Sequence, residues 1–197
     1  MNTEKIKVGI IGTGGRGIFA FGKGIAARED AAVVALCDPN QERMQAATLE
    51  LGQKQNLYTT VEEMLAREKL DAVVITSPDY CHEANAVAAL NGGVNVLVDK
   101  PLSTTVKGCK NIICAAERSG KTIMMGFNLR HNAVLQRLKQ LIVDGVLGRV
   151  FLIENREFYN GGRTYMSRWN RLYAQSGGLW IHKGSHESKD NDERLEA

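Results

Sequence analysis

Short apolar runs alternate along most of the chain with segments whose apolar residues recur at helical spacing. The runs lie at residues 8–11, 33–36, 70–76, 94–98 and 122–127. Apolar runs of about four to eight residues, bounded by Gly, Pro or polar residues, are typical of strands buried on both faces. The alternation therefore predicts a sheet of parallel strands that is covered by helices.

Helix signals fill the segments between the apolar runs. Pro39 is predicted to open a helix that Gly52 ends, and Thr60 with Glu63 has the pattern of a capping box. Further helices are predicted over residues 80–90, 105–118 and 133–143. Right-handed crossovers then give an α/β fold with a doubly wound parallel sheet of the Rossmann type, in the strand order 3-2-1-4-5-6.

A glycine cluster of the form G-x-G-x-x-G follows the first apolar run. Gly12 permits a tight turn, Gly14 lets a pyrophosphate approach the backbone, and Gly17 allows close packing of helix and strand. Asp38 follows the second run, about 20 residues after Gly17, where an acid that binds ribose hydroxyls is expected. The pattern predicts a dinucleotide site, and its alternative is a glycine-rich turn without a ligand.

Five turns follow the carboxyl ends of the predicted parallel strands, so they are predicted to meet at one edge of the sheet. Ligands of such folds bind at that edge. The residues predicted to bind the cofactor at this rim are Gly12, Thr13, Gly14, Gly15, Arg16, Gly17, Asp38, Thr76, Ser77, Pro78, His82, Asp99, Lys100 and Asn128. Arg16 could reach a phosphate, and its alternative is simple solvent exposure. His82 is either a cofactor contact or only a residue of a first helical turn.

Lys100 is the sharpest candidate for chemistry. It follows a buried strand at the point where the nicotinamide half of a dinucleotide would lie, and Pro101 restricts the backbone after it. A lysine in that place can shuttle a proton, and the alternative is a surface lysine beside a turn. His182 and His186 share one helix face, but Lys183 stands where H-E-x-x-H requires a glutamate, so no metal site is predicted.

Composition adds limits to this picture. The chain has 197 residues, a formal net charge of +3 and no basic run, so nucleic acid is not an expected partner. No apolar stretch reaches the roughly 18 residues of a membrane span. Four cysteines occur without a C-x-x-C pattern: Cys37, Cys81, Cys109 and Cys114. They are predicted to be buried or half-buried thiols of a cytoplasmic protein.

The pattern changes at Gly148. Residues 149–158 are a strand candidate, and Trp169 lies in a following glycine- and arginine-rich loop that could line a pocket for a polar substrate. The sequence therefore predicts a nucleotide-binding domain over residues 1–147 and the incomplete start of a second α/β domain over 148–186. Residues 187–197 are strongly charged and are predicted to be a disordered tail.

Five motifs in order resemble the glucose–fructose oxidoreductase / inositol dehydrogenase / MocA family. They are the glycine turn, T-S-P-D-Y-C-H-E-A, N-V-L-V-D-K-P-L-S, G-F-N-L-R-H and G-G-L-W-I-H-K-G-S-H. The resemblance implies an NAD(P)-dependent oxidoreductase that acts on a hydroxyl of a sugar, cyclitol or related polyol. It also implies a Rossmann domain followed by an α/β domain with an open, mainly antiparallel sheet.

The resemblance also implies roles for single residues. The catalytic lysine of the family's E-K-P motif maps onto Lys100, with Asp99 in place of the glutamate. The histidine that ends the second-domain motif maps onto His186, and His182 stands where the family has an aspartate. Hydride would pass between the substrate carbon and the nicotinamide while Lys100 hydrogen-bonds the reacting hydroxyl and His186, together with His182, moves the proton.

The expected cofactor is NAD. Asp38 is followed by Pro39 and Asn40 with no adjacent arginine, which favours NAD, while Arg43 one turn later keeps NADP open as the alternative. Members of the family are considerably longer, so the resemblance implies a C-terminally truncated chain whose full-length form is a homo-oligomer. The two hypotheses are a sugar or polyol oxidoreductase and a catalytically inactive NAD-binding module.

Overall fold

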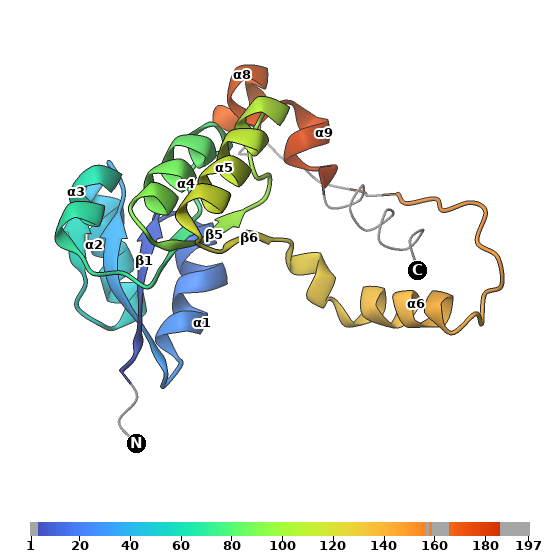
Figure 1. Cartoon of the computed structure of the whole chain (residues 1–197), viewed down its shortest axis with the longest axis horizontal. Coiled ribbons are helices and arrows are strands. Elements are labelled where there is room, and N and C mark those ends of the chain that lie inside the picture. Colours follow the sequence, from blue (N-terminus) through green and yellow to red (C-terminus); the bar gives the residue numbers. More distant parts are fainter. Residues whose placement is uncertain (1–3, 157, 159–165, 186–197) are drawn as a thin grey trace. The chain divides into compact units, whose positions relative to one another are not determined.

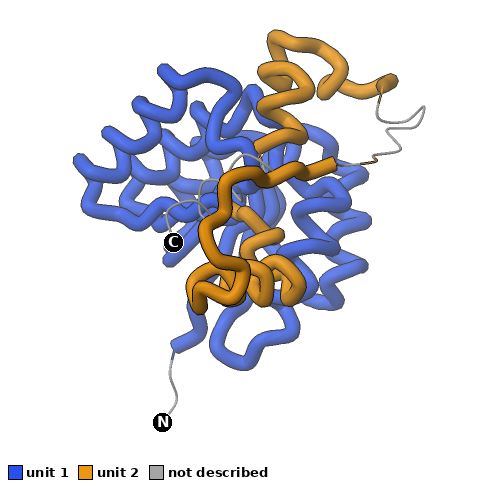
Figure 2. Tube along the Cα trace, turned by 90° about the vertical axis from the view of Figure 1, so that its right-hand side faces the viewer, with its two compact units in different colours: residues 1–125 blue, residues 126–197 orange. Residues whose placement is uncertain are grey.

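The computed structural model describes residues 4–156, 158 and 166–185 of the chain (Figure 1). The chain divides into two compact units, residues 1–125 and residues 126–197 (Figure 2). Each unit is described by itself below. Among the described residues, no helix has both the length and the apolar character that crossing a bilayer requires.

A six-stranded sheet forms the centre of the first unit, and β3, β2, β1, β4 and β5 pair in parallel. Its order is β3-β2-β1-β4-β5-β6, which confirms the predicted order. The strands are β1 (Ile6–Ile11), β2 (Ala31–Cys37), β3 (Asn56–Tyr58), β4 (Ala72–Ile75), β5 (Asn95–Asp99) and β6 (Ile123–Gly126). Five of them coincide with the apolar runs of the sequence.

The remaining strand, β3, has no apolar run, and it lies at the edge of the sheet beside β2. Tyr58 is its only buried residue, and Leu57 is 41% exposed. An edge strand is paired on one side only, so it does not need the continuous apolar sequence of a central strand.

Helices cover both faces of this sheet (Figure 1). They are η1 (Arg16–Gly22), α1 (Lys23–Ala26), α2 (Gln41–Leu51), α3 (Val61–Arg67), η2 (Asp79–Cys81), α4 (His82–Asn91) and α5 (Val106–Ser119). Ile18 of η1 and Met44 of α2 pack with Ile10 in one core cluster. Helices α3, α4 and α5 contribute to a second cluster that contains Ile11. Successive residues of β1 thus face opposite layers, as expected of a doubly wound fold.

Short polar side chains begin the helices. Asn40 caps α2 by accepting a hydrogen bond of 2.9 Å from the Arg43 nitrogen, so this helix begins at Gln41 and not at Pro39 as predicted. Thr60 caps α3 by accepting a bond of 3.3 Å from the Glu63 nitrogen. These caps satisfy N–H groups that have no partner within their own helix.

The second unit contains five short helical elements whose bounds the structure gives in full. They are η3 (Asn128–His131), α6 (Ala133–Val143), η4 (Trp169–Arg171), α8 (Tyr173–Ser176) and α9 (Leu179–His182). No residue of α6 is buried. The predicted charged tail, residues 187–197, lies outside the described residues.

The strand predicted at residues 149–158 is wrong for its described residues, 149–156 and 158, none of which is in a strand. Phe151 is 92% exposed and Phe158 is 94% exposed. A strand requires a neighbouring strand to pair its N–H and C=O groups, and the apolar pattern of this segment does not supply one.

The four cysteines differ in exposure. Cys37 is buried and Cys81 and Cys109 are half-buried, but Cys114 is exposed. The prediction that all four are buried or half-buried is therefore wrong for Cys114. Cys114 lies on α5, and the residues of this helix that face the core are Gly108, Ile112, Ala115 and Ala116.

Cys114 is expected to react with iodoacetamide at pH 8 at least about tenfold faster than Cys37. Burial, and then the charge of Asp38, raises the pKa of Cys37 to about 12. At pH 8 this group stays below its pKa and remains a thiol, which is a poor nucleophile. Mass spectrometry of the labelled peptides gives both rates, and urea-unfolded chain serves as the control. Equal rates in the folded chain would contradict the packing of β2.

Candidate functional site

The glycine turn between β1 and η1 has a backbone that side chains would not permit. Gly12 has φ of +93°, and a Cβ added to it would lie 2.5 Å from the Ser77 nitrogen. A Cβ on Gly17 would overlap the Gly12 carbonyl oxygen. These two positions therefore bring the turn, η1 and the end of β4 into direct backbone contact.

Gly14 differs from these two glycines because it faces open space. No atom lies within 4 Å of the position that its Cβ would take. The structure around it does not require a glycine, so the absent side chain leaves bare backbone that a ligand can approach. A dinucleotide pyrophosphate fits such a backbone.

Asp38, at the carboxyl end of β2, is buried beside this turn. Its Oδ2 accepts hydrogen bonds from the Thr13 nitrogen at 2.9 Å and from Thr13 Oγ1 at 3.1 Å. Its Oδ1 accepts a bond of 2.9 Å from the Asn40 nitrogen. The Arg43 guanidinium lies farther away, at 3.4 Å, and is half exposed. Asp38 thus holds the turn against β2 and places a negative charge there.

The end of β4 is held to the same turn. Thr76 donates from its hydroxyl to the Gly12 carbonyl oxygen at 2.7 Å and from its backbone nitrogen to Ile11 at 2.8 Å. Asn85 donates a bond of 3.0 Å to the Ser77 hydroxyl. The first and fourth strand ends are therefore joined before any ligand binds.

Asp99 and Lys100 lie at the end of β5, next to β4. Arg16 donates to Asp99 through Nε at 2.7 Å and through Nη2 at 2.9 Å. This hydrogen-bonded pair raises the pKa of the Arg16 guanidinium. The Lys100–Pro101 peptide bond is cis, and Lys100 is half-buried. His82 is 1% exposed and contacts the Pro101 carbonyl oxygen through Nδ1 at 2.7 Å.

The first unit brings most of the predicted site residues together through the contacts above. Asn128 begins η3 and His182 ends α9, and both belong to the second unit. His182 stacks edge-on against Trp169 with their ring centres 5.4 Å apart. His186 lies outside the described residues. Within the described part of the chain, no three His, Cys, Asp or Glu side chains could hold a metal ion together.

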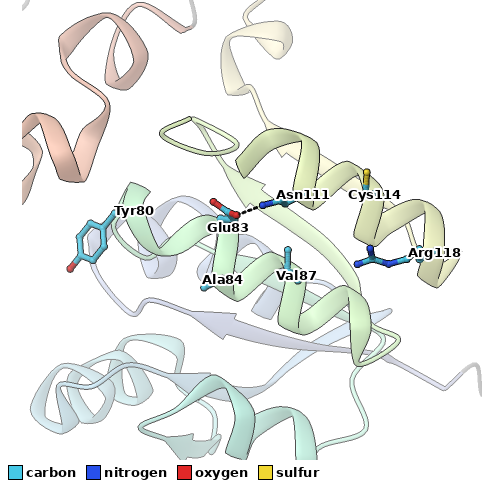
Figure 3. A pocket seen from close by; sticks show the side chains of 7 residues that line it. All are labelled: Tyr80, Glu83, Ala84, Val87, Asn111, Cys114 and Arg118. Atoms are coloured by element: carbon cyan, nitrogen blue, oxygen red, sulfur yellow. Dashed lines mark hydrogen bonds between the residues drawn. The ribbon is translucent and has the colours of Figure 1, made fainter. Parts of the chain in front are cut away.

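A hollow that sequence reasoning missed lies on α4 and α5 (Figure 3). Its volume is about 400 Å³, and its lining residues are Tyr80, Glu83, Ala84, Val87, Asn111, Cys114 and Arg118. Asn111 donates a hydrogen bond of 2.7 Å to Glu83 across it. None of these residues is among those predicted to bind the cofactor at the rim, although Tyr80, Glu83 and Ala84 lie in the T-S-P-D-Y-C-H-E-A motif.

Comparison with known proteins identifies the family and agrees with the fold. The family model "Oxidoreductase family, NAD-binding Rossmann fold" matches residues 6–127. The chain belongs to this family. The model of the family's C-terminal alpha/beta domain matches residues 139–188. The resemblance inferred from the five motifs is thereby confirmed.

Two curated relatives in this oxidoreductase family are dehydrogenases. An inositol 2-dehydrogenase/D-chiro-inositol 3-dehydrogenase of Halalkalibacterium halodurans is 32% identical over 75% of this chain and 43% of its own length. A D-glucoside 3-dehydrogenase of Escherichia coli is 26% identical over 94% of this chain and 53% of its own length. The chain thus spans about half the length of these relatives.

Solved structures of the family agree with the fold. The WlbA dehydrogenase from Bordetella pertussis, solved in complex with NADH and UDP-GlcNAcA, is 27% identical and has a TM-score of 0.81. The match covers 98% of this chain and 59% of the WlbA chain. A myo-inositol 2-dehydrogenase from Lactobacillus plantarum superposes with a TM-score of 0.86 at 20% identity. This match covers 98% of the present chain and 57% of the dehydrogenase chain.

Proposed function

We propose that the chain carries the cofactor-binding part of an NAD-dependent oxidoreductase that acts on a hydroxyl or keto carbon of a sugar, cyclitol or related polyol. The observation that carries this proposal is the open space at Gly14, next to Thr13, whose backbone nitrogen donates to Asp38. The names of the dehydrogenase relatives support the substrate class. The alternative is an NAD-binding module without turnover.

The residues of the rim fit a dinucleotide. The turn around Gly14 would hold the pyrophosphate, and Asp38 would accept hydrogen bonds from ribose hydroxyls. Asp38 accepts three short bonds from Thr13 and Asn40, and the contacts of Arg43 Nη1, at 3.4 and 3.5 Å, are its longest, so a ribose hydroxyl would take their place. Its buried negative charge disfavours a 2′-phosphate, so NAD is proposed over NADP although Arg43 lies 3.4 Å away.

Lys100 is proposed to hold the reacting oxygen of the substrate. The bound cofactor supplies the site that accepts or donates hydride. Lys100 would donate a hydrogen bond to the hydroxyl or keto oxygen and stabilise the charge that develops there. His186, with His182, is proposed to take or return the proton at the same oxygen, as the motif resemblance implies.

The setting of the protein is part of the same proposal. We place it in the cytoplasm, with a small-molecule substrate and without a nucleic-acid or membrane partner. Its mild net charge of +3 and the absence of a basic run in the sequence support the absence of a nucleic-acid partner. We also propose a homo-oligomer for a full-length form that carries the complete second domain.

Turnover distinguishes the two hypotheses. The 197-residue chain is mixed with NAD and a panel of inositols, glucosides and UDP-sugars, and NADH formation is followed by absorbance. Lys100→Met is expected to lower kcat by about 100-fold or more while the Kd for NADH stays within about twofold. Lys107→Met, on the exposed side of α5, is the matched control. NADH binding without turnover on any substrate would favour the inactive module, and absence of NADH binding would refute both.

A further inference from the structure

Both neighbours of Lys100 are held by side chains from other crossovers. Asp99 precedes it and accepts two hydrogen bonds from Arg16, the first residue of η1 after β1. Pro101 follows it and is contacted by His82, which begins α4 after β4. These two contacts span 83 and 19 residues of sequence, respectively. The candidate lysine therefore lies between two fixed points.

The contact of Arg16 with Asp99 has the geometry of a rigid pair. Both carboxylate oxygens accept a bond, at 2.7 and 2.9 Å, and the Asp99 side chain is only 11% exposed. Two parallel bonds to a planar guanidinium fix orientation as well as distance. The guanidinium carbon also lies 5.2 Å from the centre of the Phe21 ring, which limits its motion further.

The contact of His82 with Pro101 is buried and short. The ring of His82 lies between two backbone carbonyl groups, with Nδ1 2.7 Å from Pro101 and Nε2 2.9 Å from Ser77. Each tautomer of the neutral ring donates to one of these two oxygens, and burial, with 1% of His82 exposed, limits rotation of the ring. His82 thereby ties the backbone after Lys100 to the turn at the end of β4.

We propose that Arg16 and His82 are positioning residues for Lys100, acting through Asp99 and Pro101. This rests on the proposed function, in which Lys100 meets the reacting oxygen. A lysine side chain is flexible, so its ammonium group keeps one position only when the backbone at that residue is fixed. Nε and Nη2 of Arg16 and both ring nitrogens of His82 contact the chain itself. The positioning role is separate from the cofactor contacts that the sequence predicts for these two residues.

The reactivity of Lys100 tests this directly. The full chain is labelled with a succinimidyl ester, and peptide mass spectrometry gives the rate at Lys100 relative to the exposed Lys54. The variants are Arg16→Gln, Asp99→Asn, their double variant, and His82→Gln. Arg28→Gln is the matched control, because Arg28 makes the same two-bond contact with Asp30, both at 2.7 Å, at an exposed position.

Each single variant is expected to change the Lys100 rate at least about threefold, and the Arg16/Asp99 double variant no more than either of its singles. Arg16→Lys keeps the charge without the planar fork, so it should resemble Arg16→Gln. Unchanged Lys100 rates in folded variants, or a change as large in Arg28→Gln, would overturn the proposal. If Arg16→Gln does not fold, Arg16→Lys and His82→Gln supply the same comparison.

NADH titration of the same proteins separates this inference from the proposed function. Wild-type chain that binds no NADH would refute the proposed function, whatever the labelling rates are. Wild-type chain that binds NADH while Lys100 reacts alike in all variants would refute only the positioning roles of Arg16 and His82.

Discussion

Gly12→Ala is expected to lower the free energy of unfolding by about 3 kcal/mol or more. The φ of +93° is strained for alanine, and the new Cβ would lie 2.5 Å from the Ser77 nitrogen and 2.7 Å from the Thr76 carbonyl carbon. Both atoms belong to the backbone at the end of β4, so no side chain can move aside. Urea denaturation followed by circular dichroism measures the change.

Gly52 and Gly14 distinguish the two causes of the loss at Gly12, which are the strained φ and the close contact with the backbone after β4. Gly52 has φ of +63° with open space around it, so Gly52→Ala should cost only the strain of that conformation, about 1 kcal/mol. A loss at Gly12 no larger than this would contradict the close approach of the turn to β4.

Gly14→Ala should leave the free energy of unfolding within about 0.5 kcal/mol of wild type, because nothing lies near its Cβ position. It should weaken NADH binding by about tenfold or more, since the methyl group occupies the space that a pyrophosphate needs. Unchanged NADH affinity in this variant would place the cofactor elsewhere.

Asp38→Ala is expected to cost about 3 kcal/mol of stability and to weaken NADH binding strongly. Its carboxylate accepts two bonds from Thr13 and one from Asn40, and Thr13 is 3% exposed. Removing the acid leaves the buried Thr13 N–H without its acceptor. Urea denaturation and fluorescence titration with NADH measure the two effects.

Asp38→Asn should cost less, because the amide keeps one acceptor oxygen but turns an N–H₂ group toward a donor of the turn. Asp30→Ala is the control, an exposed acid whose contact with Arg28 contributes little in water, and its unfolding midpoint should hardly move. Equal midpoints for Asp38→Ala and Asp30→Ala would contradict the role of Asp38 in holding the turn.

The central strands β1, β2, β4 and β5 were predictable because they are largely buried between two layers of helices and so need a continuous apolar sequence. Edge strand β3 escaped prediction for the opposite reason, since Leu57 is 41% exposed and only Tyr58 enters the core. The segment 149–158 shows the limit of the same reasoning. An apolar pattern suits a strand, but the partner that completes it is not encoded in the pattern.

Within the candidate site, the local requirements were predictable and the distant contacts were not. Gly12 and Asp38 are marked by spacing, because a turn and the strand after it impose fixed distances along the chain. The pairing of Arg16 with Asp99 depends on which strand ends become neighbours in space. The sequence signals this pair only through the shared position of both residues at the rim, which is too coarse to pair one guanidinium with one carboxylate.

The most direct test of NAD binding at the rim is an amide ¹H–¹⁵N correlation spectrum of the chain, titrated with NADH. The expected result is saturable shifts that are largest at residues 12–17, with smaller ones at Asp38 and at residues 76–78 and 99–101. Shifts confined to the hollow on α4 and α5, around Glu83 and Asn111, or no shifts in the folded chain, would contradict the assignment of the rim as the cofactor site.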